Sequence, residues 1–247
     1  MGTFGRRLLL AVDAKGYGGV DVITQRQFQE ALQRLLAEAA DAVGLERERW
    51  DTQEGGDSVF AVLPDGASEP DLVDPFMRQL DAGLRSFNHG REPRAWLRLR
   101  AAVHFGTASP APTGFVGRAP VEIGRILNSD VLRSALAAVP DACLAVAVST
   151  TVFNDVVREA YTTFRAREFR EVRIVEKEFV GRAWIWVPGV DARTLDLGGG
   201  SGGPSCGEDG GVADVCSPTA PISQENTVVT VNYGPIHAER AVFGIHN

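Results

Sequence analysis

The fold is decided by the stretch Leu8-Leu-Leu-Ala-Val-Asp13-Ala-Lys-Gly16-Tyr17-Gly18-Gly19, near the start of the chain. Five apolar residues run into an aspartate, and a glycine-rich turn follows at once. An apolar run of this length is typical of a buried strand. We therefore expect Asp13 at the end of a strand, where its side chain can reach into a site. The glycines that follow allow backbone N–H groups to approach an anion closely.

A second carboxylate occurs in a similar setting, in Trp50-Asp-Thr-Gln53-Glu-Gly55-Gly56-Asp57-Ser58-Val-Phe-Ala-Val-Leu63. This pattern predicts two strands joined by a Gly-Gly turn, which is a hairpin with Asp57 at its tip. Mg²⁺ takes oxygen ligands and is usually held by one or two carboxylates together with substrate phosphates. Asp13 and Asp57 are therefore candidate metal ligands. The alternative is that both are ordinary turn residues with no chemistry attached.

Length and composition indicate one globular domain with an appendage. The chain has 247 residues, 44% of them hydrophobic and 23% charged, with a net charge of −7. An acidic chain lacks the positive surface that non-specific nucleic-acid binding requires, so we expect no nucleic-acid partner. No apolar run reaches membrane-spanning length, and the one before Asp13 is too short for a signal peptide. The three cysteines lack metal-ligand spacing, so we expect a reduced, cytoplasmic protein with no membrane partner.

Hydrophobic periodicity and turn residues predict alternating strands and helices. Strands are expected at 8–13, at 50–63 as the hairpin, and at 96–106, 142–148, 171–175 and 182–187. Helices are expected at 24–44, 71–87, 119–127, 130–138 and 149–157. Thr24 and Gln27 suggest a capping box at the start of the first helix, and residues 107–112 suggest a proline-rich turn. This order predicts an α+β fold with a ferredoxin-like mixed sheet and helices largely on one face.

The composition changes after Leu195. Residues 198–211 are mostly glycine and are typical of a flexible linker. Residues 226–247 are rich in β-formers again, but they are too few to build a core of their own. We therefore predict a globular domain at 1–192, a linker at 193–225 and a β-prone tail at 226–247.

Three motifs in the first 110 residues resemble those of the class III nucleotidyl cyclases, the catalytic domains of adenylate and guanylate cyclases. The segment Asp13-Ala-Lys-Gly16-Tyr17 resembles the Asp-x-x-Gly-Phe motif that carries the first metal aspartate of that family. Gly56-Asp57 resembles the Gly-Asp that carries the second. The segment Arg100-Ala-Ala-Val-His104-Phe-Gly106 resembles the Arg-x-Gly-Ile-His-x-Gly strand.

A fourth match follows in order. Phe115-Val-Gly117 resembles the segment before the next helix of the family, and Arg125 lies where the family places a transition-state arginine, eight residues after the glycine. The resemblance covers residues 7–188 and implies the cyclase palm fold. It implies that two Mg²⁺ or Mn²⁺ ions on Asp13 and Asp57 bind an NTP. It also implies a homodimer in which Arg125 comes from the other chain.

The same resemblance suggests residues that bind the phosphates. These are Gly16, Tyr17 and Gly18 in the first turn, with Lys177 and Arg182 on the last hairpin as weaker candidates. The alternative for Lys177 and Arg182 is that they are solvated charges on an edge strand.

Several positions depart from the family pattern. The catalytic asparagine, four residues before the arginine, is replaced by Val121, which cannot hydrogen-bond a ribose. The two purine-reading positions are Gln53 and Gly114. We take Gln53 as the base-recognition candidate, and because a glutamine can pair with a uracil, cytosine or adenine edge, the base stays open. Bacterial cyclases that make cyclic UMP or CMP in antiviral defence belong to the same superfamily.

The hairpin tip also allows a different interpretation. Gly55-Gly-Asp-Ser resembles the Gly-Gly-Asp-Glu-Phe motif of diguanylate cyclases, which have a similar palm core. The glutamate of that motif is absent here, and Arg125 fits the class III pattern better.

The tail contains an imperfect repeat of aromatic-Gly-(x)-Ile-His, ten residues apart. It resembles pseudo-palindromic bacterial amyloid signalling motifs, relatives of the RIP homotypic interaction motif, which stack as cross-β layers. That resemblance implies recruitment by an NLR-type sensor carrying a matching copy. The alternative is a terminal hairpin docked on the edge of the domain's sheet. The candidate motif residues are Asn232, Gly234, Ile236, Val242, Phe243, Gly244, Ile245 and Asn247.

The sequence therefore predicts a metal-dependent nucleotidyl cyclase that makes a 3′,5′-cyclic NMP and pyrophosphate from an NTP. Assembly through the tail would recruit or activate it in bacterial immune signalling. The alternative is a catalytically degenerate cyclase-like effector or scaffold that the tail assembles. Val121 is the residue that separates these two hypotheses.

Overall fold

The computed structural model describes residues 5–112 and 114–197. Its strands are β1 (Gly5–Ala14), β2 (Asp51–Glu54), β3 (Ser58–Val62), β4 (Leu99–Ala111), β5 (Gly114–Val116), β6 (Leu144–Ser149), β7 (Arg170–Glu176) and β8 (Phe179–Trp186). The α-helices are α1 (Val22–Ala42), α2 (Glu69–Asp71), α3 (Met77–Asn88), α4 (Arg118–Leu127), α5 (Asp130–Ala138) and α6 (Thr150–Val152). Two π-helical segments, η3 (Leu72–Phe76) and η5 (Phe153–Arg158), continue α2 and α6. Short 3₁₀ turns lie at η1 (Tyr17–Gly19), η2 (Arg47–Arg49), η4 (Pro93–Ala95), η6 (Ala166–Glu168) and η7 (Ala192–Thr194).

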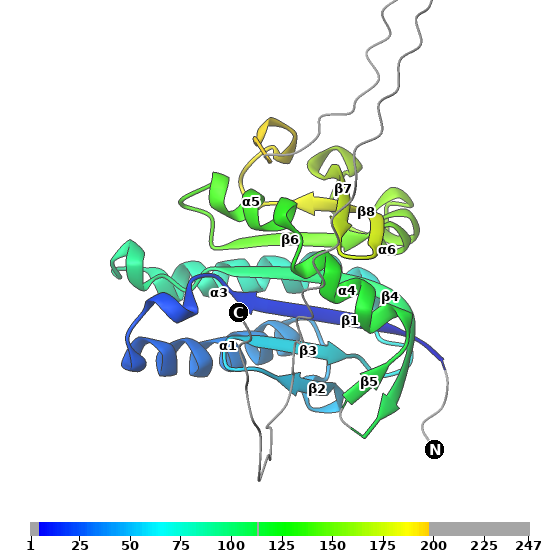
Figure 1. Cartoon of the computed structure of the whole chain (residues 1–247), viewed down its shortest axis with the longest axis horizontal. Coiled ribbons are helices and arrows are strands. Elements are labelled where there is room, and N and C mark those ends of the chain that lie inside the picture. The colour runs from blue at the N-terminus through cyan, green and yellow to red at the C-terminus, as the bar shows by residue number, and fades with distance from the viewer. Residues whose placement is uncertain (1–4, 113, 198–247) are drawn as a thin grey trace, which may run out of the picture. The chain divides into compact units, whose positions relative to one another are not determined.

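In the described ranges, seven strands form one mixed sheet in the order β2-β3-β1-β4-β6-β8-β7, and β5 pairs with β4 (Figure 1). The pairing of β4 with β6 is parallel, and the other pairings are antiparallel. Since β1 and β4 lie at the centre, both are covered on their two faces and consist largely of apolar residues. The predicted α+β fold with a mixed sheet is confirmed.

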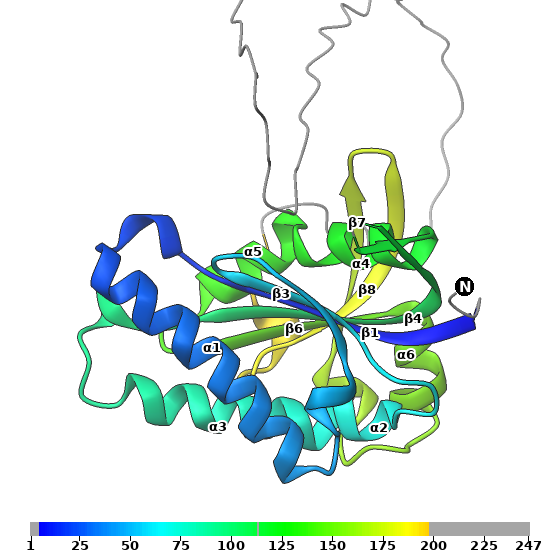
Figure 2. The same ribbon diagram turned by 90° about the horizontal axis from the view of Figure 1, so that it is seen from below.

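Helices cover both faces of the sheet, so the expectation of helices largely on one face was wrong. Figure 2 shows α1 and α3 on one side and α4 and α5 on the other. The alternation of β1 explains this arrangement, because Leu8, Leu10 and Val12 belong to one buried cluster and Leu9 and Ala11 to another. Successive side chains of a strand point to opposite faces, and an apolar run therefore requires cover on both.

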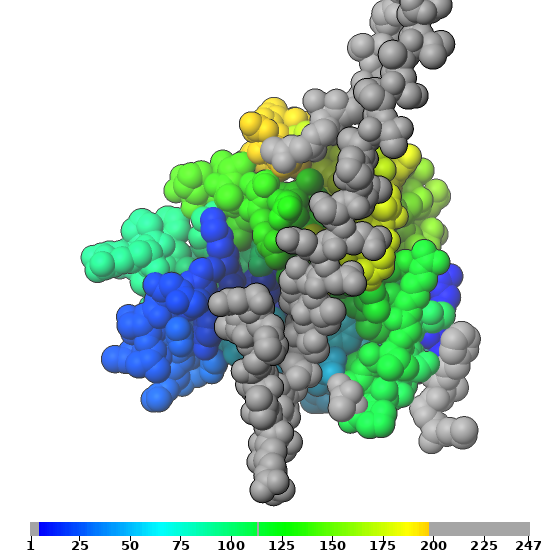
Figure 3. Space-filling model, viewed as in Figure 1, coloured from blue at the N-terminus to red at the C-terminus, as the bar shows by residue number. Residues whose placement is uncertain are grey.

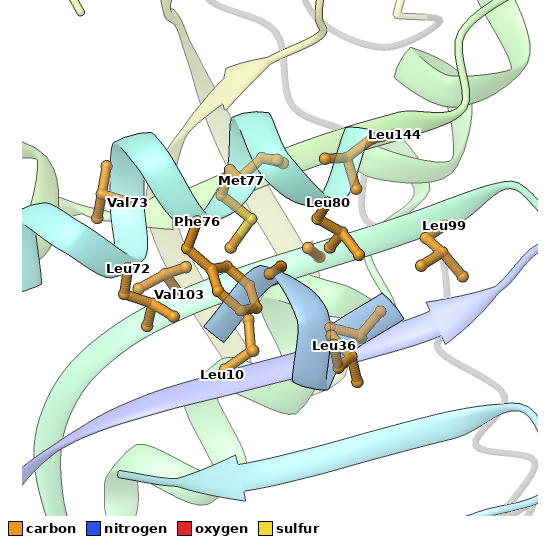
Figure 4. Packing of buried hydrophobic residues seen from close by; sticks show 14 of the residues in the cluster. Leu10, Leu36, Leu72, Val73, Phe76, Met77, Leu80, Leu99, Val103 and Leu144 are labelled. Carbon is orange, nitrogen blue, oxygen red and sulfur yellow. The ribbon is translucent and has the colours of Figure 1, made fainter. Parts of the chain in front are cut away.

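The larger cluster lies between the sheet and the layer of α1 and α3. Leu10 of β1, Leu36 of α1 and Phe76 of η3 point toward one another there (Figure 4). The relative solvent exposure of each of these three residues is 0%. Burying a side chain of this size contributes about 1.5–3 kcal/mol, so this layer fixes the position of β1 and of the residues at its end.

Two local expectations need correction. The cap of the first helix is Asp21 rather than Thr24, because the Asp21 carboxylate accepts hydrogen bonds from the N–H groups of Ile23 and Thr24 at 2.9 and 3.0 Å. The predicted turn at 107–112 is mostly strand, because β4 continues to Ala111 and pairs with β5. Proline is tolerated there because that part of β4 is a two-stranded ribbon beyond the main sheet.

Residues 198–225 of the predicted linker and the whole tail motif lie outside the described residues. Residues 193–197, predicted as the start of the linker, belong to the described domain, and Leu197 is buried there. Within the described residues, no helix is both long enough and apolar enough to cross a membrane.

Candidate active site

Asp13, Asp57 and Arg100 lie together at one end of the central strands, and we call them the carboxylate cluster. In the register of the sheet, Asp13 of β1 is opposite Ser58 of β3 and Arg100 of β4. The Ala14 N–H donates to the carbonyl oxygen of Asp57 at 2.8 Å, which ties the hairpin tip to the end of β1. The sheet therefore brings together the two aspartates that the sequence singled out.

Asp13 is paired with Arg100. The Arg100 Nε donates to one Asp13 carboxylate oxygen at 2.9 Å, and its Nη2 donates to the other. The two side chains are only 15% and 12% exposed. Burial raises the pKa of Asp13; the Arg100 guanidinium opposes this rise, and the negative charge of Asp57 adds to it. The charge of Asp57 therefore acts on the Asp13 carboxylate.

The carboxylate cluster fits a divalent cation bound with phosphate. Two interacting carboxylates are hard oxygen donors of the kind that Mg²⁺ and Mn²⁺ take. An ionised carboxylate has about four acceptor sites, so Asp13 can accept from Arg100 and still offer oxygen to a metal. The Arg100 Nη1 is buried without a hydrogen-bond partner, which leaves a donor for an anion beside the two aspartates. Among the described residues, no group of three or more His, Cys, Asp or Glu side chains is placed to hold a metal ion.

The glycine turn that follows β1, residues 16–19, is hydrogen-bonded to side chains of α1, and its glycines have no neighbouring atoms where a side chain would be. The Gln25 amide donates to the carbonyl oxygens of Tyr17 and Val20 at 3.3 and 3.1 Å. The Gln29 amide donates to the Tyr17 hydroxyl at 2.6 Å. A Cβ added at Gly16, Gly18 or Gly19 would meet nothing within 4 Å, so the backbone is accessible from that side. Gly16 has a φ of 78°, a conformation that glycine adopts at little cost.

Arg125 lies on α4 and is paired with Glu178, and we call these two the arginine cluster. The Arg125 Nη2 donates to the Glu178 carboxylate at 2.7 Å, and the side chains are 22% and 71% exposed. The Arg125 Nε is buried without a hydrogen-bond partner. Glu178 and Lys177 form the turn between β7 and β8, and Figure 2 shows this hairpin rising past α4. The other charge suggested for that hairpin, Arg182, is paired with Glu171 at 2.9 Å.

The two clusters have separate partners within one chain. Asp13 is opposite Arg100, at the start of β4. The helix that carries Arg125 begins beside Thr107, whose carbonyl oxygen would lie 2.8 Å from a Cβ at Gly117. The helix then runs back along β4, since Glu122 lies 3.2 Å from the His104 Nε2, and Arg125 follows almost one turn later. Within one chain Asp13 forms an ion pair with Arg100, and Arg125 forms an ion pair with Glu178. The carboxylate cluster and the arginine cluster therefore have no ion pair between them.

Gln53 and Gly114, at the two base-reading positions, lie against each other. A Cβ at Gly114 would lie 1.7 Å from the Gln53 Nε2, and Gly114 has a φ of 125°. The rings of Phe60 and Phe115 are 5.9 Å apart and hold β5 against β3, so the β4–β5 ribbon folds toward β2. This ribbon forms a lobe at the surface of the molecule (Figure 3). The Gln53 side chain occupies the space that a side chain at position 114 would need.

Sequence reasoning missed the partners of these residues. Glu178 was not selected, although it lies in the connection between the strands predicted at 171–175 and 182–187. His104 appeared only as part of a strand motif; its Nε2 lies 3.2 Å from Glu122 of α4. Glu122 also accepts from Arg118, so it joins β4 to the first turns of the helix that carries Arg125.

Comparison with solved structures identifies proteins that have a similar fold. No protein family matches the sequence, and no curated protein is significantly similar to it. The structure resembles the guanylyl cyclase Cya2, with a TM-score of 0.51 and 15% identity over 79% of this chain and 98% of that one. It also resembles an adenylate/guanylate cyclase/hydrolase from Silicibacter pomeroyi, with a TM-score of 0.53 and 16% identity over 76% and 99% of the two chains.

The chain has the fold of a nucleotidyl cyclase catalytic domain. A third solved structure supports this, the guanylate cyclase domain of RhGC from Catenaria anguillulae in complex with GTP. Its TM-score is 0.51, with 12% identity over 75% of this chain and 97% of that one. At these identities the likeness concerns the fold, and the activity of this chain has to be argued from its own residues.

Proposed function

We propose that this protein is a nucleotidyl cyclase that converts an NTP to a 3′,5′-cyclic NMP and pyrophosphate. The observation that carries the proposal is the carboxylate cluster: two interacting aspartates and a half-satisfied guanidinium beside an open glycine turn. It lies on a fold shared with solved cyclase domains. Neither feature alone would be enough, because one fold supports many activities.

In the proposed reaction the ribose 3′-oxygen attacks the α-phosphorus. A bond forms between these atoms, the bond from the α-phosphorus to the bridging oxygen breaks, and pyrophosphate leaves with that electron pair. The hydroxyl proton passes to solvent. Bound divalent ions supply charge neutralisation at the phosphates. Asp13 and Asp57 hold them, the free Arg100 Nη1 donates to a phosphate oxygen, and the turn at Gly16–Gly18 lets the backbone approach the phosphates.

Arg125 stabilises the charge that develops on the transferring phosphoryl group, where a preorganised donor has the largest effect. Since Arg125 and Asp13 do not meet within one chain, a homodimer supplies the two halves of the site from different protomers. The separate pairing of Asp13 with Arg100 and of Arg125 with Glu178 supports this arrangement. The base edge is read by Gln53, whose amide both donates and accepts.

A second candidate function is supported by Val121. This residue is half exposed and lies one helical turn before Arg125, so the two face the same way. A valine there offers the ribose no hydrogen bond. Under this second function the domain binds nucleotide or a partner without turnover, as an effector or scaffold.

One assay separates the two functions. The purified full-length chain is incubated with each of the four NTPs and Mn²⁺, and cyclic nucleotide and pyrophosphate are measured by mass spectrometry. The cyclase proposal expects both products in equal amounts from at least one NTP, and none from the Asp57→Ala variant. Nucleotide binding without either product would favour the second function.

The tail proposal extends this function. Residues 226–247 assemble copies of the chain and recruit them to a sensor of the NLR type that carries a matching motif, in bacterial defence within the cytoplasm. The sequence repeat in the tail supports this proposal. A peptide of residues 226–247 is expected to form thioflavin T-positive fibres with a strand spacing of roughly 4.7 Å. A peptide that stays monomeric at high concentration would contradict the assembly proposal and leave the cyclase proposal intact.

A further inference from the structure

The seven-stranded sheet ends in two edge strands, β2 and β7, which Figure 1 shows at opposite ends of the sheet. The edge strand β2 has four residues, and the β4–β5 ribbon folds toward it, with Gln53 against Gly114. The edge strand β7 has seven residues, and no strand within 5–112 and 114–197 pairs with its outer side. An open edge offers unpaired N–H and C=O groups to another strand. We call the outer side of residues 170–176 the β7 edge.

The side chains of β7 alternate between a buried face and an exposed face of the sheet. Val172 and Ile174 are 8% and 1% exposed and belong to the buried cluster that includes residues of α4 and α5. Glu171, Arg173 and Val175 lie on the other face and are exposed. Any strand that pairs with the β7 edge therefore meets a row of acid, base and apolar side chain on that face.

Arg173 has no counter-charge on the exposed face. It lies directly opposite Arg182 of β8, and like charges at opposite positions of two strands are destabilising. The Arg182 guanidinium donates to Glu171 at 2.9 Å, whereas no carboxylate in the described part of the chain pairs with Arg173. An acidic side chain opposite Arg173, on the outer side of β7, would compensate its charge.

A second copy of β7 supplies that acid in one antiparallel register. When a two-fold axis at Val172 relates the two copies, Glu171 of each lies opposite Arg173 of the other, and Val175 lies opposite Phe169. When the axis is at Arg173 instead, the two arginines lie opposite each other, which is unfavourable. Charges on an edge strand usually prevent pairing. On β7 they oppose the second register and favour the first.

We propose that the β7 edge is a self-association surface, at which two copies of this chain pair their β7 strands in antiparallel orientation about Val172. The sheet then continues from one copy into the other. Backbone hydrogen bonds supply affinity, and the two symmetric contacts between Glu171 and Arg173 select the register and the partner. The contact is isologous, because the same surface is used by both copies.

This surface is separate from the contact that a divided active site needs. Asp13 lies on β1, four strands in from β7, a distance of roughly 19 Å. Pairing at the β7 edge therefore leaves Asp13 free for the catalytic dimer. A chain with two different isologous surfaces assembles into open arrays rather than closed dimers. The array rests on the proposed function, to which the catalytic dimer belongs, whereas the strand pairing does not.

A charge exchange tests the pairing directly. Glu171→Arg places two arginines opposite each other in the proposed register, and Arg173→Glu places two glutamates opposite each other. Each variant is expected to associate at least about tenfold more weakly than the wild type, because two symmetric contacts change from attraction to repulsion. An equal mixture of the two variants, or the double variant, restores opposite charges at both contacts and should regain most of the affinity.

The measurement uses the full-length protein without nucleotide. Sedimentation velocity gives the association, and hydrogen exchange of the amides in residues 170–176 reports whether the β7 edge is paired. We expect these amides to be protected in the wild type and in the mixture, and to exchange faster in each single variant. Glu30→Arg, which makes the same charge change at an exposed position of α1, is the matched control and should associate like the wild type. All variants keep the tail, so differences between them come from the substituted residues.

Three results would overturn the proposal. These are single variants that associate as strongly as the wild type, a mixture that regains no affinity, and β7 amides that exchange equally fast in the wild type and in Glu171→Arg. Rescue by mixing also excludes a folding defect as the cause of the loss, because a defect within each chain would persist in the mixture. Since no nucleotide is present, a negative result leaves the cyclase proposal intact, and a chain that turns over no NTP can still pair at this edge.

Discussion

The carboxylate cluster and the arginine cluster each join an acid to an arginine, but they differ in burial and in geometry. Asp13 and Arg100 are only 15% and 12% exposed and are joined by two hydrogen bonds between central strands. Arg125 and Glu178 are joined by one hydrogen bond, and Glu178 is 71% exposed on a protruding turn. The first pair is fixed by the sheet before any ligand arrives. The second is a contact that a phosphate can replace at small cost, because exposed ion pairs contribute about 0–1 kcal/mol.

The difference shows how a site divided between two chains can be prepared in each of them. The end that holds the cations must be rigid, because metal ligands have to keep their geometry. Arg125, which contacts the substrate charge only in the transition state, can form a weak ion pair with Glu178 until then. The predictions below test this contrast, from the largest expected effect to the smallest.

The largest effect is expected from Asp57→Ala. A metal supplies several kcal/mol of transition-state stabilisation and each tenfold in rate corresponds to about 1.36 kcal/mol, so we expect kcat to fall about a thousandfold or more. The thermal unfolding temperature should change little, because a half-buried side chain at a hairpin tip contributes little to the core. Glu54→Ala, an exposed acid on the same hairpin, is the control and should keep full activity. If both variants retained activity, the carboxylate cluster would not be the metal site.

A smaller loss is expected from Arg125→Ala. Removing one preorganised donor costs about a hundredfold to a thousandfold in kcat, with little change in KM if the contact forms only in the transition state. Steady-state kinetics with the preferred NTP measure this split. Arg118→Ala, on the same helix with its side chain 84% exposed, is the control. A rise in KM alone would show that Arg125 binds the ground state.

A gain is expected from Glu178→Gln. The exchange removes the negative charge that pairs with Arg125, and since such an exposed pair is worth at most about 1 kcal/mol, kcat should rise by no more than about fivefold. The same change in an Arg125→Ala background should do nothing, because the pair is already absent. A gain that persists in that background would separate Glu178 from Arg125.

The smallest effect concerns His104, which joins β4 to α4. Burial lowers the pKa of His104, with the charges of Arg6 and Arg118 acting in the same direction and Glu122 against it. The unfolded chain therefore binds this proton more readily, so the stability that neutral His104 contributes is complete above the unfolded pKa of about 6.5 and is lost as the pH falls below it. Unfolding in urea at pH 7.5 and 5.5 should show a smaller pH dependence in His104→Gln. If the pH dependence of the unfolding free energy were the same in His104→Gln as in the wild type, other titratable groups would be its cause.

Much of this organisation was predictable from the sequence, for identifiable physical reasons. The apolar run before Asp13 needs burial on two faces, and the Gly-Gly turn before Asp57 allows one hairpin geometry, so both carboxylates could be placed at strand ends. The pairing of Arg125 with Glu178 could not be foreseen, because it depends on how the β7–β8 hairpin bends past α4. The contact of Gln53 with Gly114 depends on the fold of the β4–β5 ribbon, whose strand residues were expected to form a turn. Local patterns fix strand ends, whereas contacts between distant segments depend on packing.

The most direct test of the central claim is complementation between two inactive chains. Asp13→Ala removes the carboxylate half of the site and Arg125→Ala removes the arginine half, and each variant alone should keep at most about 1% of the wild-type activity. If the two halves come from different protomers, mixing the variants under conditions that exchange subunits restores one intact site per heterodimer. Activity should then approach about a quarter of the wild-type level, because half of the dimers formed at random are heterodimers and each has one of two sites intact. No recovery in a mixture shown to contain heterodimers, with active wild type measured alongside, would contradict a site divided between two chains.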